Sequence, residues 1–370
     1  MQKRTLGKTG LETSLIGFGG FHLLETPQSD AEKLLNGYLD RGGNYIETAR
    51  EYGNGLSERK IREAVSHRRD EYILATKSPA RTREGLLESL EQSLRDLQTD
   101  RVELFFMHHV QTIREAEQVL GPGGAMEGAV EAQKAGKLRY IGITGHGQPD
   151  SLIYSVEQHP YDVLMCVLNY YDRFNYPKTE GVLLPGCEKR GVGVMAMKSL
   201  ADGYLYRSAE RALRYSLSLP VACVVAGINR EDYLQKDLDL ADRFEPMSHD
   251  DKEKLFHTAP ELGSYVCRLC KKCKDADGFE PYLVFLLEGL FDRQMDNGRV
   301  PPTDQYALRE RLRFWFGQAE RARDIYRSLE VKVQPEKDYS HLNPLCPYGI
   351  DIERKLKVSH AKLSGEAAFF

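Results

Sequence analysis

The sequence lacks the features of a membrane, secreted or nucleic-acid-binding protein. No apolar run approaches the ~20 residues of a membrane-spanning helix, and the basic start at residues 1–7 is not followed by the apolar core of a signal peptide. A formal net charge of −4 over 370 residues gives no excess of positive charge for nucleic acid. These absences predict a cytoplasmic protein that binds neither membranes nor nucleic acid.

A dinucleotide-binding fingerprint and a disulfide framework are missing as well. The glycine-rich residues 17–20 lack the strand, turn and helix context of such a fingerprint. Of the seven cysteines, Cys166, Cys187 and Cys223 are scattered through apolar segments, whereas the other four lie in the last third of the chain. In a reducing compartment, clustered thiols of this kind indicate metal binding rather than disulfides.

Apolar runs alternate with helix-like segments along the first two thirds of the chain. Near-continuous apolar runs are typical of a parallel sheet covered by helices. Eight such pairs within ~250 residues predict an α/β fold of the TIM (β/α)8 barrel type, and the length of 370 residues leaves room for a second domain. The predicted strands are residues 14–19, 44–49, 72–77, 102–108, 138–144, 162–169, 192–198 and 221–227.

Three of these strands end in a side chain suited to acid-base chemistry. Glu47, Lys77 and His108 follow one another at intervals of 30 and 31 residues, and each closes an apolar run. Active sites of TIM barrels lie at the carboxyl ends of the strands, so the three side chains are expected to meet there. A lysine that ends a buried strand needs an anionic partner, and Glu47 on the neighbouring strand offers one.

Tyr52 lies on the loop after Glu47 and completes this candidate site. A tyrosine at its usual pKa near ~10 is a poor acid at neutral pH, but an adjacent ammonium group lowers that pKa. Lys77, held by Glu47, is expected to have this effect, while His108 hydrogen-bonds the same oxygen or a substrate carbonyl. The four side chains therefore predict general acid-base catalysis on a carbonyl or an alcohol.

Polar residues also mark the ends of the later strands. They either belong to the same site or serve only as polar filling at the end of the barrel, and the sequence leaves both interpretations open. These residues are Thr144, His146, Asn169, Lys198 and Asn229.

With these motifs in order, the chain resembles the aldo-keto reductases over about its first 245 residues. The resemblance implies Tyr52 as the proton donor and the pair of Lys77 and Glu47 as the groups that lower its pKa. It implies His108 as the residue that orients the substrate carbonyl. His109 competes for this role, but adjacent strand residues face opposite ways and the family pattern favours His108. The matching segments are an opening hairpin at residues 4–11 and residues 47–53, 75–77, 107–108, 140–144 and 196–200.

The resemblance also implies NADP or NAD as a cofactor, with several departures. The family usually has aspartate at the position of Glu47, and it has two amides and a stacking tyrosine where this chain has Gly145, Met165 and Leu168. The loss of these groups argues against ordinary affinity for nicotinamide. The helix after the last strand either holds a phosphate at its N-terminus or simply begins in solvent. The expected cofactor contacts are Thr144, Asn169, Lys198, Gly227, Asn229 and Arg230.

The last third of the chain carries a second signal, a C-x2-C-x2-C run followed far downstream by a Cys-Pro pair. Three thiolates in one tight loop and a remote fourth resemble the half-motif of a ferredoxin-type 4Fe-4S cluster. Structural zinc is the alternative, but its ligands usually come in two separated pairs. The cysteines allow one cluster, with Cys267, Cys270, Cys273 and Cys346 as its ligands.

Some aldo-keto reductase relatives in anaerobic microbes carry a C-terminal ferredoxin-like module, and this chain resembles them over nearly its whole length. The resemblance implies a barrel at residues 1–262 and a small, mainly helical iron–sulfur domain at 263–370, with a helical insertion at 281–330. The cluster either exchanges electrons with a ferredoxin- or flavodoxin-type carrier or only stabilises its domain. We expect an oxidoreductase of small carbonyls or alcohols. The alternatives are a reductase fed by the cluster and an electron-transfer subunit with a catalytically silent barrel.

Overall fold

Eight parallel strands form a closed barrel in the computed structural model, which describes residues 1–292 and 319–365. Each strand pairs with its neighbours in sequence, and the last strand pairs with the first. This arrangement confirms the predicted TIM barrel. The strands are β3 (Ile16–Gly19), β4 (Tyr45–Glu47), β5 (Ile73–Ser78), β6 (Val102–Met107), β7 (Leu138–Gly145), β8 (Val163–Val167), β9 (Gly193–Met197) and β10 (Cys223–Gly227).

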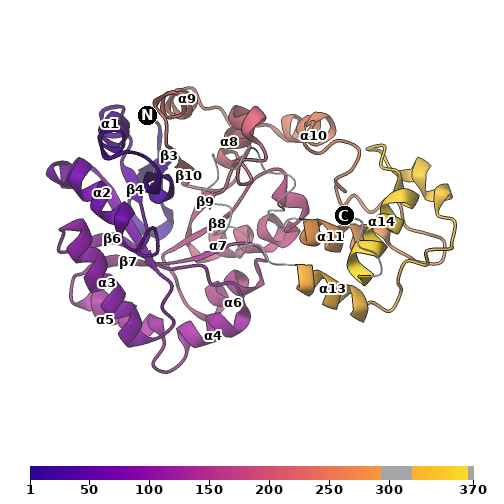
Figure 1. The fold of residues 1–370 in the computed structure, drawn as a ribbon, viewed down its shortest axis with the longest axis horizontal. Coiled ribbons are helices and arrows are strands. Elements are labelled where there is room, and N and C mark those ends of the chain that lie inside the picture. The colour runs from indigo at the N-terminus through magenta and orange to yellow at the C-terminus, as the bar shows by residue number, and fades with distance from the viewer. Residues whose placement is uncertain (293–318, 366–370) are drawn as a thin grey trace. The chain divides into compact units, whose positions relative to one another are not determined.

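Helices surround the strands on the outside of the barrel, as Figure 1 shows. An antiparallel hairpin of β1 (Lys3–Thr5) and β2 (Glu12–Ser14) precedes the first barrel strand, as expected. Its turn carries Leu6 into the barrel core, where the side chain is fully buried. The barrel helices are α1 (Gln28–Asp40), α2 (Leu56–Val65), α3 (Arg83–Leu97), α4 (Ile113–Leu120), α5 (Ala125–Lys134), α6 (Asp150–Gln158), α7 (Leu184–Arg190), α8 (Ala209–Leu217) and α9 (Glu231–Asp242).

Side chains point alternately into and out of the barrel along each strand. The inward residues fill a core that includes Tyr45 on β4, Ala75 on β5 and Phe106 on β6. The same period of two directs the next inward residue of each strand toward the carboxyl end of the core. Those next residues are Glu47, Lys77 and His108.

The chain divides into two compact units, Met1–Tyr170 with Lys178–Met247, and Tyr171–Pro177 with Ser248–Phe370. The sequence placed the boundary at residue 262, whereas α10 (His249–Thr258) belongs to the second unit. Of the predicted insertion at 281–330, residues 293–318 lie outside the described part, which contains α11 (Pro281–Asp292) and α13 (Ala319–Ser328). The unit ends with α14 (Ile352–Ser364). None of the described helices combines the length and the apolar character needed to cross a bilayer.

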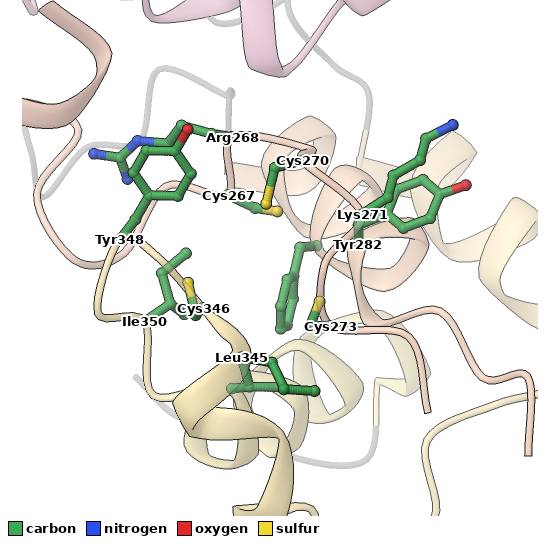
Figure 2. A pocket seen from close by; sticks show the side chains of 12 residues that line it. Cys267, Arg268, Cys270, Lys271, Cys273, Tyr282, Leu345, Cys346, Tyr348 and Ile350 are labelled. Atoms are coloured by element: carbon green, nitrogen blue, oxygen red, sulfur yellow. The ribbon is translucent and has the colours of Figure 1, made fainter. Parts of the chain in front are cut away.

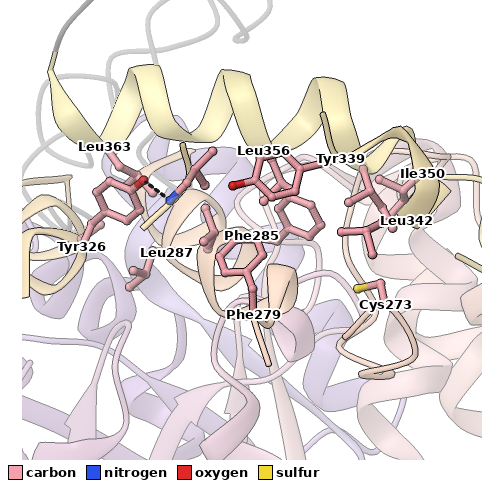
Figure 3. Packing of buried hydrophobic residues seen from close by; sticks show 14 of the residues in the cluster. Cys273, Phe279, Phe285, Leu287, Tyr326, Tyr339, Leu342, Ile350, Leu356 and Leu363 are labelled. Carbon is pink, nitrogen blue, oxygen red and sulfur yellow. Dashed lines mark hydrogen bonds between the residues drawn. The ribbon is translucent and has the colours of Figure 1, made fainter. Parts of the chain in front are cut away.

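The second unit has a hydrophobic core of its own, shown in Figure 3. Phe285 of α11, Tyr326 of α13 and Leu356 of α14 are buried in it. Cys273 lies in the same cluster, so the cysteine loop packs directly against these helices. Any group that the cysteines bind is therefore connected to the packing of this unit.

Asp237 in α9 carries a carboxyl group whose pKa burial raises to about 7. The unfolded chain has the ordinary aspartate pKa of ~4, so Asp237 is harder to ionise in the folded state. Its protonated form therefore contributes stability in acid, and this contribution is lost as the pH rises from about 4 to about 7. The side chain keeps intermediate exposure, which moderates the effect. We expect Asp237→Asn to match the wild type near pH 4 and to exceed its free energy of unfolding by about 1–2 kcal/mol at pH 8.

Urea unfolding at several pH values between 4 and 8 measures this difference for Asp237. Glu231→Gln removes an exposed carboxylate from the same helix and serves as the control. Parallel pH profiles for the wild type and Asp237→Asn would contradict the raised pKa.

Candidate active site and candidate metal centre

The parallel strands bring Glu47, Lys77 and His108 to one rim of the barrel. Strand β5 pairs with β4 on one side and with β6 on the other, so the carboxyl ends of these strands lie side by side. The three side chains are buried, with exposed fractions of 4%, 2% and 1%. The structure thus brings together the three residues that the spacing selected.

Lys77 connects the groups of this rim. Its ammonium group forms an ion pair with Glu47 and donates a hydrogen bond to the carbonyl oxygen of Thr48 at 2.9 Å. It also donates to the hydroxyl oxygen of Tyr52 at 3.1 Å. The tyrosine ring packs edge-on against Phe21, with 4.9 Å between the ring centroids. Lys77 and Phe21 therefore fix both the oxygen and the ring of Tyr52.

Of the two consecutive histidines, His108 is the one beside the tyrosine. Its ring meets the Tyr52 ring edge-on, with 5.9 Å between the centroids. The side chain of His109 keeps 27% of its exposure, whereas that of His108 keeps 2%. The imidazole that shares the enclosed surroundings of the tyrosine is therefore that of His108.

Burial dominates the protonation of these groups. It raises the pKa of Tyr52, with a further contribution from the charge of Glu51, and it lowers the pKa of Lys77 well below its usual range. Burial also lowers the pKa of His108 to about 3, so this imidazole is neutral at pH 7. The expectation that Lys77 lowers the pKa of Tyr52 is wrong in this structure, because an enclosed phenolate loses its hydration and also faces the negative charge of Glu51. Tyr52 is a neutral phenol, the form that donates a proton.

Glu51 is the residue of this site that the sequence analysis missed. Its Oε2 atom lies 2.9 Å from both His108 Nδ1 and His109 Nε2. Burial would raise the pKa of Glu51, but its contacts with the two histidines prevail and lower that pKa. Glu51 stands on a loop, outside the strand period, and only its place next to Tyr52 marked it in the sequence.

The expected cofactor contacts on the later strands take part in internal hydrogen bonds. Thr144 accepts a hydrogen bond from the backbone N–H of His109 at 2.9 Å. The amide of Asn169 donates to the carbonyl oxygen of Lys198 at 3.0 Å, and the ammonium group of Lys198 pairs with Asp202 at 2.6 Å. These bonds hold the side chains at the rim, and their contact with a cofactor stays a prediction.

The three residues that depart from the family pattern are closely packed in the barrel. A Cβ atom at Gly145 would lie 3.0 Å from the carbonyl oxygen of Val110, so an amide side chain at this position would crowd that oxygen. Met165 belongs to the barrel core with an exposed fraction of 1%, and Leu168 is 2% exposed. The amides and the stacking ring that the resemblance would place here have no counterpart at these three positions.

The helix after the last barrel strand, α9, begins among acidic side chains. Glu231 and Asp232 occupy its first turn, where negative charge competes with a phosphate. Arg230 is the N-cap residue, and its Nε donates to Asp232 at 2.8 Å. Gly227 and Asn229 are exposed just before this helix. The carboxylates and the paired arginine disfavour a phosphate at this helix end.

Four cysteines line one pocket of the second unit, as Figure 2 shows. They are free thiols, and the empty volume of the pocket, including its open mouth, is about 320 Å³. Burial raises the pKa of Cys267 to about 12 and that of Cys273 to about 11. Although Cys267, Cys270, Cys273 and Cys346 converge on this space, no three of their sulfur atoms lie within 4.8 Å of one another.

The loop between the first three cysteines is tightly wound. Leu269 and Lys271 have left-handed φ values of +54° and +62°. Such values cost roughly 1–2 kcal/mol in residues other than glycine, and strain of this kind is found mainly at functional sites. The backbone N–H of Leu269 donates to the sulfur of Cys267 at 3.4 Å. The winding brings the thiols of Cys267, Cys270 and Cys273 to the same pocket.

Known proteins match the barrel part of the chain. Residues 15–255 match the model of the aldo/keto reductase family. The chain is 30% identical over 219 residues to an L-galactose dehydrogenase of Arabidopsis thaliana, covering 55% of this chain and 67% of that protein. It is 24% identical over 313 residues to an uncharacterized oxidoreductase of Bacillus subtilis, covering 71% and 98%. A solved aldo-keto reductase of Bacillus halodurans in its holo form superposes with a TM-score of 0.60 at 26% identity, over 68% of this chain and 94% of that one.

Proposed function

This chain belongs to the aldo/keto reductase family of NAD(P)H-dependent oxidoreductases, and we propose that Tyr52 is the proton donor in the reduction of a small carbonyl compound. The reverse reaction oxidises the alcohol. The observation that carries the proposal is the hydrogen bond of 3.1 Å from Lys77 to the Tyr52 hydroxyl oxygen on a buried barrel rim. Because this oxygen accepts from Lys77, the phenolic hydrogen is left for a second acceptor. The relative named as an L-galactose dehydrogenase makes sugars a first substrate class to test.

Each rim residue has a separate role in carbonyl reduction. When bound, NAD(P)H would supply the hydride for the carbonyl carbon. Tyr52 transfers its phenolic proton to the carbonyl oxygen, and neutral His108 orients that oxygen with a hydrogen bond. Lys77, anchored by Glu47 and by the carbonyl oxygen of Thr48, keeps the tyrosine oxygen in place. A positioned general acid contributes about 10²–10⁴-fold to such a reaction.

The residues available for the nucleotide fit it only in part. The absence of amides and of a stacking ring at Gly145, Met165 and Leu168 supports a second candidate function, a reductase that receives its electrons from a cluster without tightly bound nicotinamide. In the first candidate, Thr144 and Asn169 would contact the nicotinamide. The remaining candidates for nucleotide contacts are Lys198, Gly227, Asn229 and Arg230, and a phosphate at Arg230 would have to displace its bond to Asp232.

Titration of the anaerobically purified protein with NADPH and NADH separates the two candidates. We expect at least one nucleotide to bind with one-to-one stoichiometry, measured by its fluorescence. Asn169→Ala should weaken this binding by about tenfold, the effect of losing a hydrogen bond of about 1.4 kcal/mol. If neither nucleotide binds while the reduced protein still turns over a carbonyl, the second candidate replaces the first.

We further propose that Cys267, Cys270, Cys273 and Cys346 hold one 4Fe-4S cluster. Four thiolates around a single zinc ion, at ~2.3 Å each, would stand closer to one another than any three of these sulfur atoms do. The larger core of a cluster suits the wider spacing, and the N–H bond to the Cys267 sulfur suits a cluster ligand.

A cluster in this pocket supplies single-electron transfer, or it only stabilises the helical core around Cys273. In the first case its partner is a ferredoxin- or flavodoxin-type carrier. Thiolate ligands stay available in reducing surroundings, and oxygen attacks accessible clusters; because Cys270 is exposed, the proposal includes a cytoplasmic location in an anaerobic organism. If the barrel has no catalytic activity, the function that remains is that of an electron-transfer subunit.

A further inference from the structure

We propose a binding site for a divalent transition-metal ion at the barrel rim, formed by Glu51, His108 and His109. The carboxylate oxygen Oε2 of Glu51 lies 2.9 Å from His108 Nδ1 and 2.9 Å from His109 Nε2. All three atoms lie within 4.8 Å of one another. Within residues 1–292 and 319–365, no other three side chains with ligand atoms of this kind are so close together.

The backbone after β6 turns both histidines toward the same carboxylate. Adjacent strand residues face opposite ways, but His109 has a left-handed φ of +43°, and its N–H donates to Thr144. As a result, the two imidazole rings lie 4.7 Å apart between centroids. A φ of this sign costs roughly 1–2 kcal/mol in a residue other than glycine. A ligand shared by both rings offsets that cost.

Hydrogen bonds satisfy only some of the ring nitrogens at this three-residue site. His109 Nε2 is hydrogen-bonded to Glu51, but the buried Nδ1 of His108 has no hydrogen-bond partner. The Glu51 oxygen stands 2.9 Å from this nitrogen, outside the direction that a ring N–H requires. Buried polar atoms rarely stay without a partner. A cation between the three atoms would accept a lone pair from each of them.

The three donors match the coordination chemistry of zinc and of non-haem iron(II), which favour two imidazoles and one carboxylate. Metal–ligand distances of ~2.0–2.2 Å require the present contacts to open by only a few tenths of an ångström. The side chains of Glu51 and His109 keep 43% and 27% of their exposure, so an ion can enter from solvent. Three protein ligands leave a fourth position for water or a substrate oxygen.

Metal binding would also determine how His108 acts. An ion on Nδ1 leaves the ring hydrogen on Nε2, the tautomer that donates a hydrogen bond to an oxygen. This consequence rests on the proposed function, whereas binding of the ion does not. The two are therefore tested separately.

Titration of the anaerobically purified protein with Zn²⁺ and with Co²⁺ tests the site. We expect one ion per chain in addition to any iron, and a Co²⁺ spectrum without sulfur-to-metal charge-transfer bands. Glu51→Gln and His109→Asn should each weaken binding by at least about tenfold, because even the loss of an outer partner of a metal ligand costs ~10–100-fold. The control is His159→Asn, which changes a histidine that belongs to no such group in the described chain.

Absence of binding would overturn the proposal, as would unchanged affinity in both variants. Sulfur charge-transfer bands would also overturn it, because they would place the ion at the cysteines. Circular dichroism and iron content of each variant show whether it has folded. Since the measured quantity is metal binding, a catalytically silent barrel leaves the test valid.

Discussion

Tyr52→Phe should lower kcat for carbonyl reduction by about 10²–10⁴-fold, the usual contribution of a positioned general acid. The substitution removes only the hydroxyl group that accepts from Lys77 at 3.1 Å. It keeps the aromatic ring that packs edge-on against Phe21 and His108. Nucleotide affinity should stay close to that of the wild type. Steady-state oxidation of NAD(P)H with a panel of small aldehydes, ketones and sugars measures kcat, and fluorescence titration measures affinity.

Tyr45→Phe is the matched control for this prediction. Tyr45 is fully buried in the same barrel, and its hydroxyl group has no hydrogen-bond partner, so the loss of the oxygen should leave kcat and stability almost unchanged. Lys77→Met should lower kcat as well, and little further loss is expected when it is combined with Tyr52→Phe, because the two residues act as a unit. Tyr52 is not the proton donor if Tyr52→Phe keeps wild-type kcat.

Cys346→Ser should abolish the iron–sulfur cluster. The anaerobically purified wild type should contain about four iron and four sulfide atoms per chain, as one 4Fe-4S cluster requires. The variant should contain far less of both and should lose the visible absorbance of the cluster. Because Cys273 packs in the core of the second unit, loss of the cluster should also lower the unfolding temperature of that unit by about 10 °C, the effect of roughly 2–3 kcal/mol at this size.

Cys187→Ala is the control for the cysteine prediction, since this buried thiol lies in α7 of the barrel and not in the pocket. It should keep full iron content. Cys270→Ser, which changes an exposed ligand and disturbs no packing, should lose the cluster as Cys346→Ser does. One zinc ion per chain and no iron in the wild type would refute the cluster and leave a structural zinc site in its place.

The order of the barrel strands was predictable because burial on both faces leaves a near-continuous apolar run, whatever side chains pack on it. The place of Glu47, Lys77 and His108 was predictable for a related reason. Parallel strands share one carboxyl rim, and a period of two decides which side chains face inward there. The cysteine motif was equally recognisable from the sequence, because three of its cysteines lie within one short loop.

Tertiary structure alone decided the protonation of Tyr52 and the close approach of Glu51 to His108. Lys77 by itself would lower the pKa of the tyrosine, but the enclosure of the phenol and the nearby charge of Glu51 raise it instead. The contact of Glu51 with two histidines joins loops after different strands and follows no sequence period. A sequence pattern records which face of a strand is buried. Protonation and metal coordination depend instead on distances between atoms of residues far apart in the chain, which exist only once the barrel has closed.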